Sequence, residues 1–310
     1  MPRKSLNSSW EENNTTVMDQ AQSLRNIIKL NQQSLKPEHA RVIAVTSGKG
    51  GVGKSSVVTN LAICMARMGK RVVIFDADFG LANIEVMFGL TPQYTVSDVI
   101  YKGRDISDII TKGPLDIGFI SGGSGVVAMN NLNDMQRSYL IKNMNHLDDI
   151  CDVVLIDTGA GVSDSVLDFV RNCPEVLLVT TPDPSSLTDA YSLLKALSLG
   201  QKEDSLVSKV SIIPNKILRE EEGKGIFQKL NTVSKRFLGK ELQMAGMIPQ
   251  DPYMEKSIRT QKPVSLLYPE AKSSAAFEKI TSSLLDKPEA KKEKRGISYL
   301  FSMLLKDRRL

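Results

Sequence analysis

Residues 41–56 read RVIAVTSGKGGVGKSS. The apolar run at 41–46 is typical of a buried strand, and the segment after Lys54 has apolar residues at helical spacing. Between them, Gly48 to Ser55 fit the pattern G-x-x-x-x-G-K-[ST], which requires a strand before it and a helix after it. The stretch therefore predicts a phosphate-binding P-loop and, with it, an α/β fold.

The chemistry of this loop follows from its glycines and its polar end. Glycines let successive backbone N–H groups turn toward phosphate oxygens, and the next helix adds the partial positive charge of its N-terminus. We expect Lys54 to reach the β- and γ-phosphates of ATP and the Ser55 hydroxyl to bind Mg²⁺. The predicted ATP-binding residues of the loop are Gly48, Lys49, Gly50, Gly51, Val52, Gly53, Lys54, Ser55 and Ser56.

Strands and helices alternate along the rest of the body. Apolar runs predict strands at 41–46, 71–75, 117–120, 152–156, 175–180 and 209–213. Helical spacing predicts helices at about 54–68, 133–147, 163–171, 185–199 and 224–237. Continuous Val/Ile runs indicate strands that are buried on both faces. We expect an α/β fold with a doubly wound, mostly parallel sheet and helices on both faces.

The pattern also divides the chain into three parts. Residues 1–38 are expected to form a flexible extension that carries a short helix, and residues 39–285 the ATPase domain. Residues 286–310 are expected to form a basic linker and an amphipathic helix.

Composition narrows the classes of function. The chain has 310 residues, of which 41% are hydrophobic and 24% charged, as in ordinary soluble proteins. The net charge is +5, and residues 287–310 hold eight basic and three acidic residues (8 − 3 = +5). The body is thus formally neutral and its aromatic content is only 5%, so no direct nucleic-acid partner is expected.

The cysteine pattern and the hydropathy indicate the cellular compartment in which the protein resides. Three cysteines without a CxxC pair argue for a reducing environment and against a disulfide framework or a metal site. There is neither a signal peptide nor an apolar run long enough to cross a membrane. We therefore expect a cytoplasmic protein.

Polar residues follow three of the predicted strands. Asp76 and Asp78 come after strand 71–75, Asp157 after strand 152–156 and Asn215 after strand 209–213. Ligands of open α/β sheets bind at these carboxyl ends. Each carboxylate could instead cap a helix, and Asn215 could either pair with an adenine edge or form a turn.

The segment SGKGGVGKSS resembles the P-loop of the deviant Walker A family, which includes MinD, ParA and FlhG. The resemblance implies an ATP-dependent homodimer in which Lys49 crosses the interface to the partner's phosphates, as an arginine finger does. It also implies a slow, regulatory ATPase.

The same resemblance implies roles for the polar residues. The catalytic residues would be Lys49, Lys54 and Asp78, and Asp78 would position the attacking water. Ser55, Asp157 and Asp76 would bind Mg²⁺ or its waters. Asn215 and Pro249 would contact the adenine base.

Residues 19–25, DQAQSLR, resemble the DQAxxLR motif of FlhG-type members, also called YlxH or FleN. That motif activates the GTPase FlhF, so the resemblance implies an FlhF-like GTPase as a partner. The contacting residues would be Asp19, Gln20, Ala21, Leu24 and Arg25, with Gln20 and Arg25 able to orient water or stabilise charge. The residue pattern alone leaves open a helix that packs on its own body.

An apolar stripe marks the C-terminal segment. Ile297, Leu300, Phe301, Leu304 and Leu305 lie at i, i+3, i+4, i+7 and i+8, with basic residues on both sides. Such a helix can lie on anionic lipid at the inner face of the cytoplasmic membrane. The alternative is a terminal helix docked on the core of its own domain.

Taken together, the resemblances imply an FlhG-like ATPase that controls flagellar number and placement. It would be cytoplasmic, and peripheral on the membrane when ATP is bound. Flagellar switch or transcriptional regulator proteins are further candidate partners. A MinD-like division-site regulator and a ParA-like DNA-partition ATPase are the alternatives.

Overall fold

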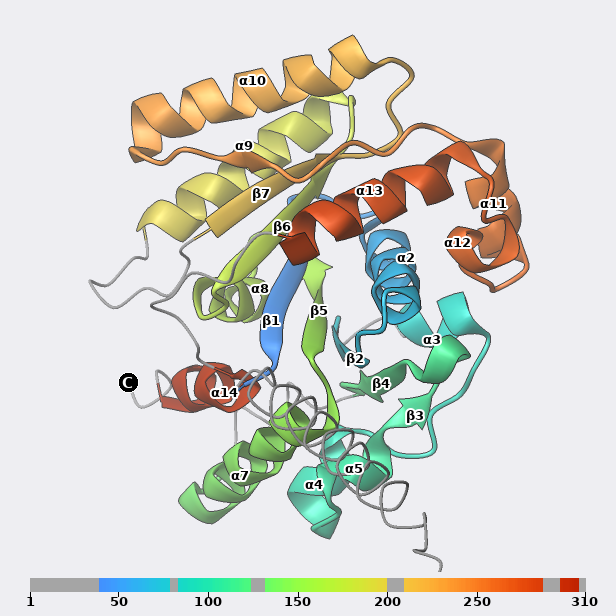
Figure 1. Ribbon diagram of the computed structural model, residues 1–310. Helices are drawn as coiled ribbons and strands as arrows, with labels where there is room; N and C mark the ends of the chain where they lie inside the picture. Colours follow the sequence, from blue (N-terminus) through green and yellow to red (C-terminus); the bar gives the residue numbers. More distant parts are fainter. Residues whose placement is uncertain (1–38, 79–82, 124–131, 200–208, 287–295, 307–310) are drawn as a thin grey trace, which may run out of the picture. The chain divides into compact units, whose positions relative to one another are not determined.

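A computed structural model describes residues 39–78, 83–123, 132–199, 209–286 and 296–306. The DQAQSLR motif and the basic residues that flank the C-terminal helix lie outside the described residues. Within them, the strands form one sheet in the order β3-β4-β2-β5-β1-β6-β7-β8 (Figure 1). Every described pair of neighbours is parallel except β3 with β4. The predicted doubly wound α/β fold is confirmed.

The observed strands begin within one residue of the predicted starts and end up to four residues beyond the predicted ends. They are β1 (Arg41–Ser47), β2 (Val72–Ala77), β3 (Thr111–Lys112), β4 (Gly118–Ser121), β5 (Val153–Ala160), β6 (Glu175–Thr180), β7 (Lys209–Pro214) and β8 (Gln243–Met244). The sequence did not predict β3 and β8, because two residues are too few to show a period.

The five predicted helices are all present, with shifted ends, and several others join them. The helices are α2 (Lys54–Arg67), α3 (Asn83–Phe88), α4 (Val96–Lys102), α5 (Ile106–Ile109), α7 (Asp134–Ile150), α8 (Asp164–Arg171), α9 (Pro184–Leu199), α10 (Glu220–Leu238), α11 (Pro252–Arg259), α12 (Val264–Leu267), α13 (Lys272–Asp286) and α14 (Ile297–Lys306).

The side chains of the central strand β1 point alternately into two apolar cores. Val42 and Ala44 of β1 enter the core with α4, α5, α7 and α14, whereas Ile43 and Val45 enter the core with α2, α3 and α13. Successive side chains of a strand point to opposite faces, so one buried strand supplies both cores. The sheet is therefore covered on both sides, which holds the carboxyl ends of its strands rigidly.

The C-terminal helix α14 is docked on the body. It lies beside α7 (Figure 1), and all five stripe residues named above are buried. The Phe301 ring lies edge-on to Phe75 of β2 at 5.4 Å and to Phe169 of α8 at 6.2 Å between centroids. The structure thus has the docked arrangement. Among the described residues, no helix is long and apolar enough to cross a membrane.

Asp148 of α7 lies beside the first described residues of the chain and beside the residue that precedes α14. Its Oδ1 accepts a hydrogen bond from the Ala40 N–H (2.9 Å), and its Oδ2 pairs with His39 Nδ1 at 2.9 Å. A Cβ built on Gly296, directly before α14, would lie 2.5 Å from the same Oδ2. The Asp148 carboxylate therefore binds the residues that precede β1 and leaves room only for a glycine before α14.

Candidate nucleotide-binding site

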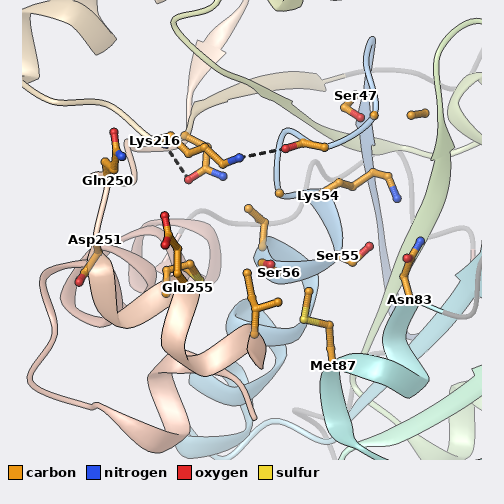
Figure 2. Close-up of a pocket in the computed structure, with 18 of the residues that line it drawn as sticks. Ser47, Lys54, Ser55, Ser56, Asn83, Met87, Lys216, Gln250, Asp251 and Glu255 are labelled. Carbon is orange, nitrogen blue, oxygen red and sulfur yellow. Dashed lines mark hydrogen bonds between the residues drawn. The ribbon is translucent and has the colours of Figure 1, made fainter. Parts of the chain in front are cut away.

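A cavity of about 600 Å³ lies at the carboxyl end of the sheet. It brings together the P-loop, the ends of β2 and β7, and the segment that begins α11 (Figure 2). Of the predicted ATP-site residues, its lining includes Gly50, Gly51, Gly53, Lys54, Ser55, Ser56, Asp78, Asn215 and Pro249. A volume of this size suits a small-molecule ligand.

The P-loop glycines have distinct tasks. Gly51 and Gly53 have φ angles of 78° and 94°, which a residue with a side chain seldom adopts. Gly48 has an ordinary φ, but a Cβ on it would overlap the backbone of Asp189 in α9. Gly48 is therefore required for close packing on α9 and does not line the cavity, a role that the motif alone does not reveal.

Lys54 and Asp157 form a buried ion pair below the loop. The Lys54 Nζ lies 2.5 Å from Asp157 Oδ1 and 4.0 Å from Asp78 Oδ2. Asp157 is fully buried, and its Oδ2 has no hydrogen-bond partner. Burial raises the pKa of Asp157, although the Lys54 ammonium and the Ser55 hydroxyl oppose this shift.

Asp76 stands beside Asp157 in the sheet register. Burial first, and then the charge of Asp157, raise the pKa of Asp76 to about 7. Two neighbouring carboxylates thus face one ammonium, and one carboxylate oxygen is left without a partner. This donor set, with Ser55, fits a divalent cation.

The residues specifically suit Mg²⁺ completed by phosphate. Among the described residues, no group of three or more His, Cys, Asp or Glu side chains forms a metal cage. Mg²⁺ typically binds through one or two carboxylates together with substrate phosphates, and there it neutralises developing charge on the phosphate oxygens. Ser55 and Asp157 would hold the ion or its waters. Asp76, the neighbour of Asp157 in the sheet register, would support them.

Asp78 is held at the mouth of this arrangement. Its backbone N–H donates to Asp76 Oδ1 (3.0 Å), and the Asn83 Nδ2 donates to Asp78 Oδ2 (3.0 Å). Its side chain is 21% exposed, so it borders the cavity. A fixed, solvent-accessible carboxylate can orient a water molecule. Asn83 was not predicted as a functional residue, since only its contact with Asp78 indicates this role.

Lys49 does not line the cavity that Lys54 lines. Its Nζ contacts Asp183 Oδ2 (3.2 Å) and Ser185 Oγ (2.5 Å) at the start of α9, and the pair is exposed. Hydrogen bonds from Ser185, and then the Lys49 ammonium, lower the pKa of Asp183. Lys49 instead lines a second cavity of about 410 Å³ on the outer side of the loop.

Asn215 and its neighbour brace the loop from β7. The Asn215 Nδ2 donates to the Val52 carbonyl (2.7 Å), and its Oδ1 accepts from the Lys216 N–H (2.9 Å). The Lys216 Nζ donates to the Gly51 carbonyl (3.0 Å; Figure 2). The second amide hydrogen of Asn215 takes no part in this brace, and the predicted adenine contact stays a prediction. Lys216 was not predicted.

Comparison with known proteins places the chain among P-loop NTPases. A ParA family model, described as NUBPL iron-transfer P-loop NTPase, matches residues 38–285. The three cysteines of the chain are free and buried.

Two similar proteins are an antiactivator and a flagellum site-determining protein. The chain is 41% identical over 244 residues to antiactivator FleN of Pseudomonas aeruginosa, covering 79% of this chain and 86% of FleN. It is 30% identical over 272 residues to the flagellum site-determining protein YlxH of Helicobacter pylori, covering 86% and 90% of the two chains.

Solved structures share the fold. MinD in the MinC:MinD complex of Aquifex aeolicus superposes with a TM-score of 0.63 at 23% identity, covering 82% of this chain and 99% of that one. MinD of Pyrococcus horikoshii, complexed with Mg-ADP, gives a TM-score of 0.62 at 24% identity, covering 80% and 96%. At these identities the likeness establishes the fold alone.

Proposed function

Because the chain belongs to the MinD/ParA family of P-loop ATPases, we propose that it is an ATP-driven switch that regulates flagellar number and placement. Its hydrolytic site is supported by the Lys54, Asp157 and Asp78 arrangement. The flagellar role is supported by the 41% identity to antiactivator FleN, which extends over most of both chains.

Hydrolysis would use residues that the fold already holds in place. Asp78 would orient the attacking water from the mouth of the cavity, while Asp76 and Asn83 fix its position. Lys54 would stabilise negative charge on the β- and γ-phosphates, and Ser55 with Asp157 would hold the Mg²⁺ shell. Catalysis of phosphoryl transfer depends mainly on such positioning and charge.

We propose that Lys49 acts across a homodimer. Its ammonium points away from the cavity of its own chain, toward Asp183 on the surface. Exposed ion pairs contribute little to stability, because both partners are well solvated when they separate. Lys49 can therefore leave Asp183 at little cost and bind the phosphates held by a partner subunit.

Membrane attachment would depend on the release of α14. Phe301 packs on Phe75, the residue directly before Asp76, and on Phe169 in the helix that follows β5 and Asp157. A rearrangement of Asp76 or Asp157 around the nucleotide would thus act directly on the docking site of α14. Released, the five apolar residues of its stripe could enter anionic lipid at the inner face of the membrane.

Dimerisation would strengthen this attachment. An isolated helix of about ten residues is marginal in water, so one tail should bind weakly. Two tails on one dimer raise the effective concentration of the second tail and bind far more strongly. The protein would then be cytoplasmic as a monomer and peripheral on the membrane as the ATP dimer.

The N-terminal extension would supply the partner-specific step. We propose that Asp19, Gln20, Ala21, Leu24 and Arg25 contact an FlhF-like GTPase and raise its GTP hydrolysis. Flagellar switch proteins or transcriptional regulators are further candidate partners.

One set of variants tests the switch. Asp78→Asn should trap the ATP dimer, which light scattering should detect, and adding Lys49→Ala should return it to a monomer. With ATP, Asp78→Asn should sediment with liposomes that contain phosphatidylglycerol, and Phe301→Asp should remove that binding. Ser302→Asp is the matched control, because it adds the same charge outside the apolar stripe. Equal sedimentation with and without Phe301→Asp would exclude the membrane role.

A division-site role is the second candidate, because the chain is also 31% identical over 253 residues to MinD of Helicobacter pylori. The full chain should stimulate GTP hydrolysis by an FlhF-like protein, and Gln20→Ala should abolish that effect. No stimulation by the wild-type chain would favour the division-site role. ATP-dependent DNA binding without sequence preference would instead favour partition.

A further inference from the structure

Lys216 adopts a backbone conformation that lysine rarely adopts. Its φ angle is 58°, in the left-handed region, which is costly for a residue with a side chain. Both neighbours are fixed: the Asn215 N–H donates to the Thr180 carbonyl at 2.8 Å, and the Ile217 N–H to the Ile248 carbonyl at 3.2 Å. The chain thus turns sharply between two anchored points, and the Lys216 side chain reaches back to the P-loop (Figure 2).

The turn holds two consecutive carbonyls of the loop. Lys216 Nζ binds the Gly51 carbonyl at 3.0 Å, and Asn215 Nδ2 binds the Val52 carbonyl at 2.7 Å. A trans peptide is planar, with its C=O and the following N–H pointing in opposite directions. A carbonyl held on the β7 side therefore directs the N–H of the next residue to the opposite side of the loop.

This geometry has a consequence for phosphate binding. The Gly51 carbonyl shares a peptide plane with the Val52 N–H, and the Val52 carbonyl shares one with the Gly53 N–H. Backbone N–H groups that point inward are the anion-binding element of such loops. Without the clamp, these two peptides could rotate, because Gly51 and Gly53 have no side chain to restrict them.

We propose that Lys216 is a positioning residue for ATP: by binding the Gly51 carbonyl it sets the P-loop N–H groups in their phosphate-binding orientation. The inference rests on ATP binding at this loop, as in the proposed function. An ammonium suits the task, since a charged donor makes a stronger hydrogen bond than a neutral one. The four-carbon stem also spans the gap between the turn and the loop.

Three substitutions separate the side chain from the backbone. Lys216→Met keeps the length but removes the donor, and Lys216→Arg keeps a charged donor. Lys216→Gly removes the side chain but relieves the left-handed backbone. Lys224→Met is the matched control, because that lysine lies on α10 and pairs with Glu220 at 3.4 Å.

The first measurement is the Kd for ATP by calorimetric titration. Lys216→Met should weaken binding roughly fivefold to tenfold, which is below the range for a buried charged donor, because the ammonium is exposed. Lys216→Arg and Lys224→Met should stay within about twofold of wild type. Lys216→Gly should bind as weakly as Lys216→Met while unfolding at no lower temperature than wild type, which excludes a folding defect.

The second measurement is the NMR order parameter of backbone amides without nucleotide. The order parameters of the Val52 and Gly53 amides should fall in Lys216→Met, while those of β1 and β5 stay unchanged. A Kd for Lys216→Met within twofold of wild type, or a Kd for Lys216→Arg as weak as for Lys216→Met, would overturn the proposal. If wild type itself failed to bind ATP, the proposed function would fall, and unchanged order parameters at Val52 and Gly53 in Lys216→Met would separately refute the clamp.

Discussion

Replacing Phe301 by Ala should loosen α14 without unfolding the sheet. The ring is fully buried and lies edge-on to Phe75 and Phe169. Truncating a buried Phe to Ala typically costs ~3–5 kcal/mol. Because α14 is terminal, the loss should appear mainly as local undocking of this helix, with the global free energy of unfolding affected less.

The assay is hydrogen exchange of the α14 amides, followed beside those of β1 and β5. A loss of ~3 kcal/mol corresponds to roughly a hundredfold faster exchange in α14, since each 1.4 kcal/mol is a factor of ten. Met303→Ala, a truncation at a half-buried position of the same helix, should accelerate exchange far less. Acceleration below about tenfold for Phe301→Ala would refute the view that this ring anchors the helix.

Three further predictions concern the site and its scaffold. Asn83→Ala should lower kcat for ATP hydrolysis about tenfold with little change in Kd, because it frees the Asp78 carboxylate; an unchanged kcat would contradict this role. Gly48→Ala should lower the free energy of unfolding by about 1–3 kcal/mol in urea titrations, because its methyl group overlaps the backbone of α9; an unchanged midpoint would contradict the packing. Burial raises the pKa of Asp152, but hydrogen bonds from Arg71 outweigh it and leave the pKa lowered. The stabilisation, below about 1 kcal/mol for so exposed a pair, is therefore present above the ordinary Asp pKa and lost as the pH falls through the lower folded value. The difference in the free energy of unfolding between wild type and Asp152→Asn should therefore shrink as the pH falls below the ordinary Asp pKa. A difference that does not depend on pH would argue against the ion pair.

The sequence predicted the elements whose signal is continuous or strictly periodic. Strands buried on both faces show unbroken Val and Ile runs, and the P-loop has its glycines at fixed spacing. Helices α3, α4 and α5 span only four to seven residues, too short to show a period. Helix α13 was not among the predicted helices, although Phe277, Ile280 and Leu284 lie at the i, i+3 and i+7 spacing that indicates a helix.

Site residues could be predicted where the residue type and the motif indicate the role. They could not be predicted where the role depends on a contact between distant parts of the chain. Asp78 and Asp157 end predictable strands, so their convergence followed from the topology. The motif includes Gly48 among the predicted ATP-binding residues, but only the structure reveals its close packing on α9. Lys216 is a lysine after an asparagine in the sequence, and only its left-handed backbone and its bond to Gly51 distinguish it.

Asp148 lies between two segments that are far apart in the sequence. Its carboxylate binds Ala40 and His39 before β1 and leaves room only for Gly296 before α14, whereas the P-loop follows the other end of β1. Seven residues of strand separate the two ends by about 20 Å. In the proposed function, nucleotide chemistry would therefore take place on the rim of the sheet opposite Asp148. Two protomers that joined at the nucleotide rim would leave Asp148, His39 and Gly296 on the far side of each subunit.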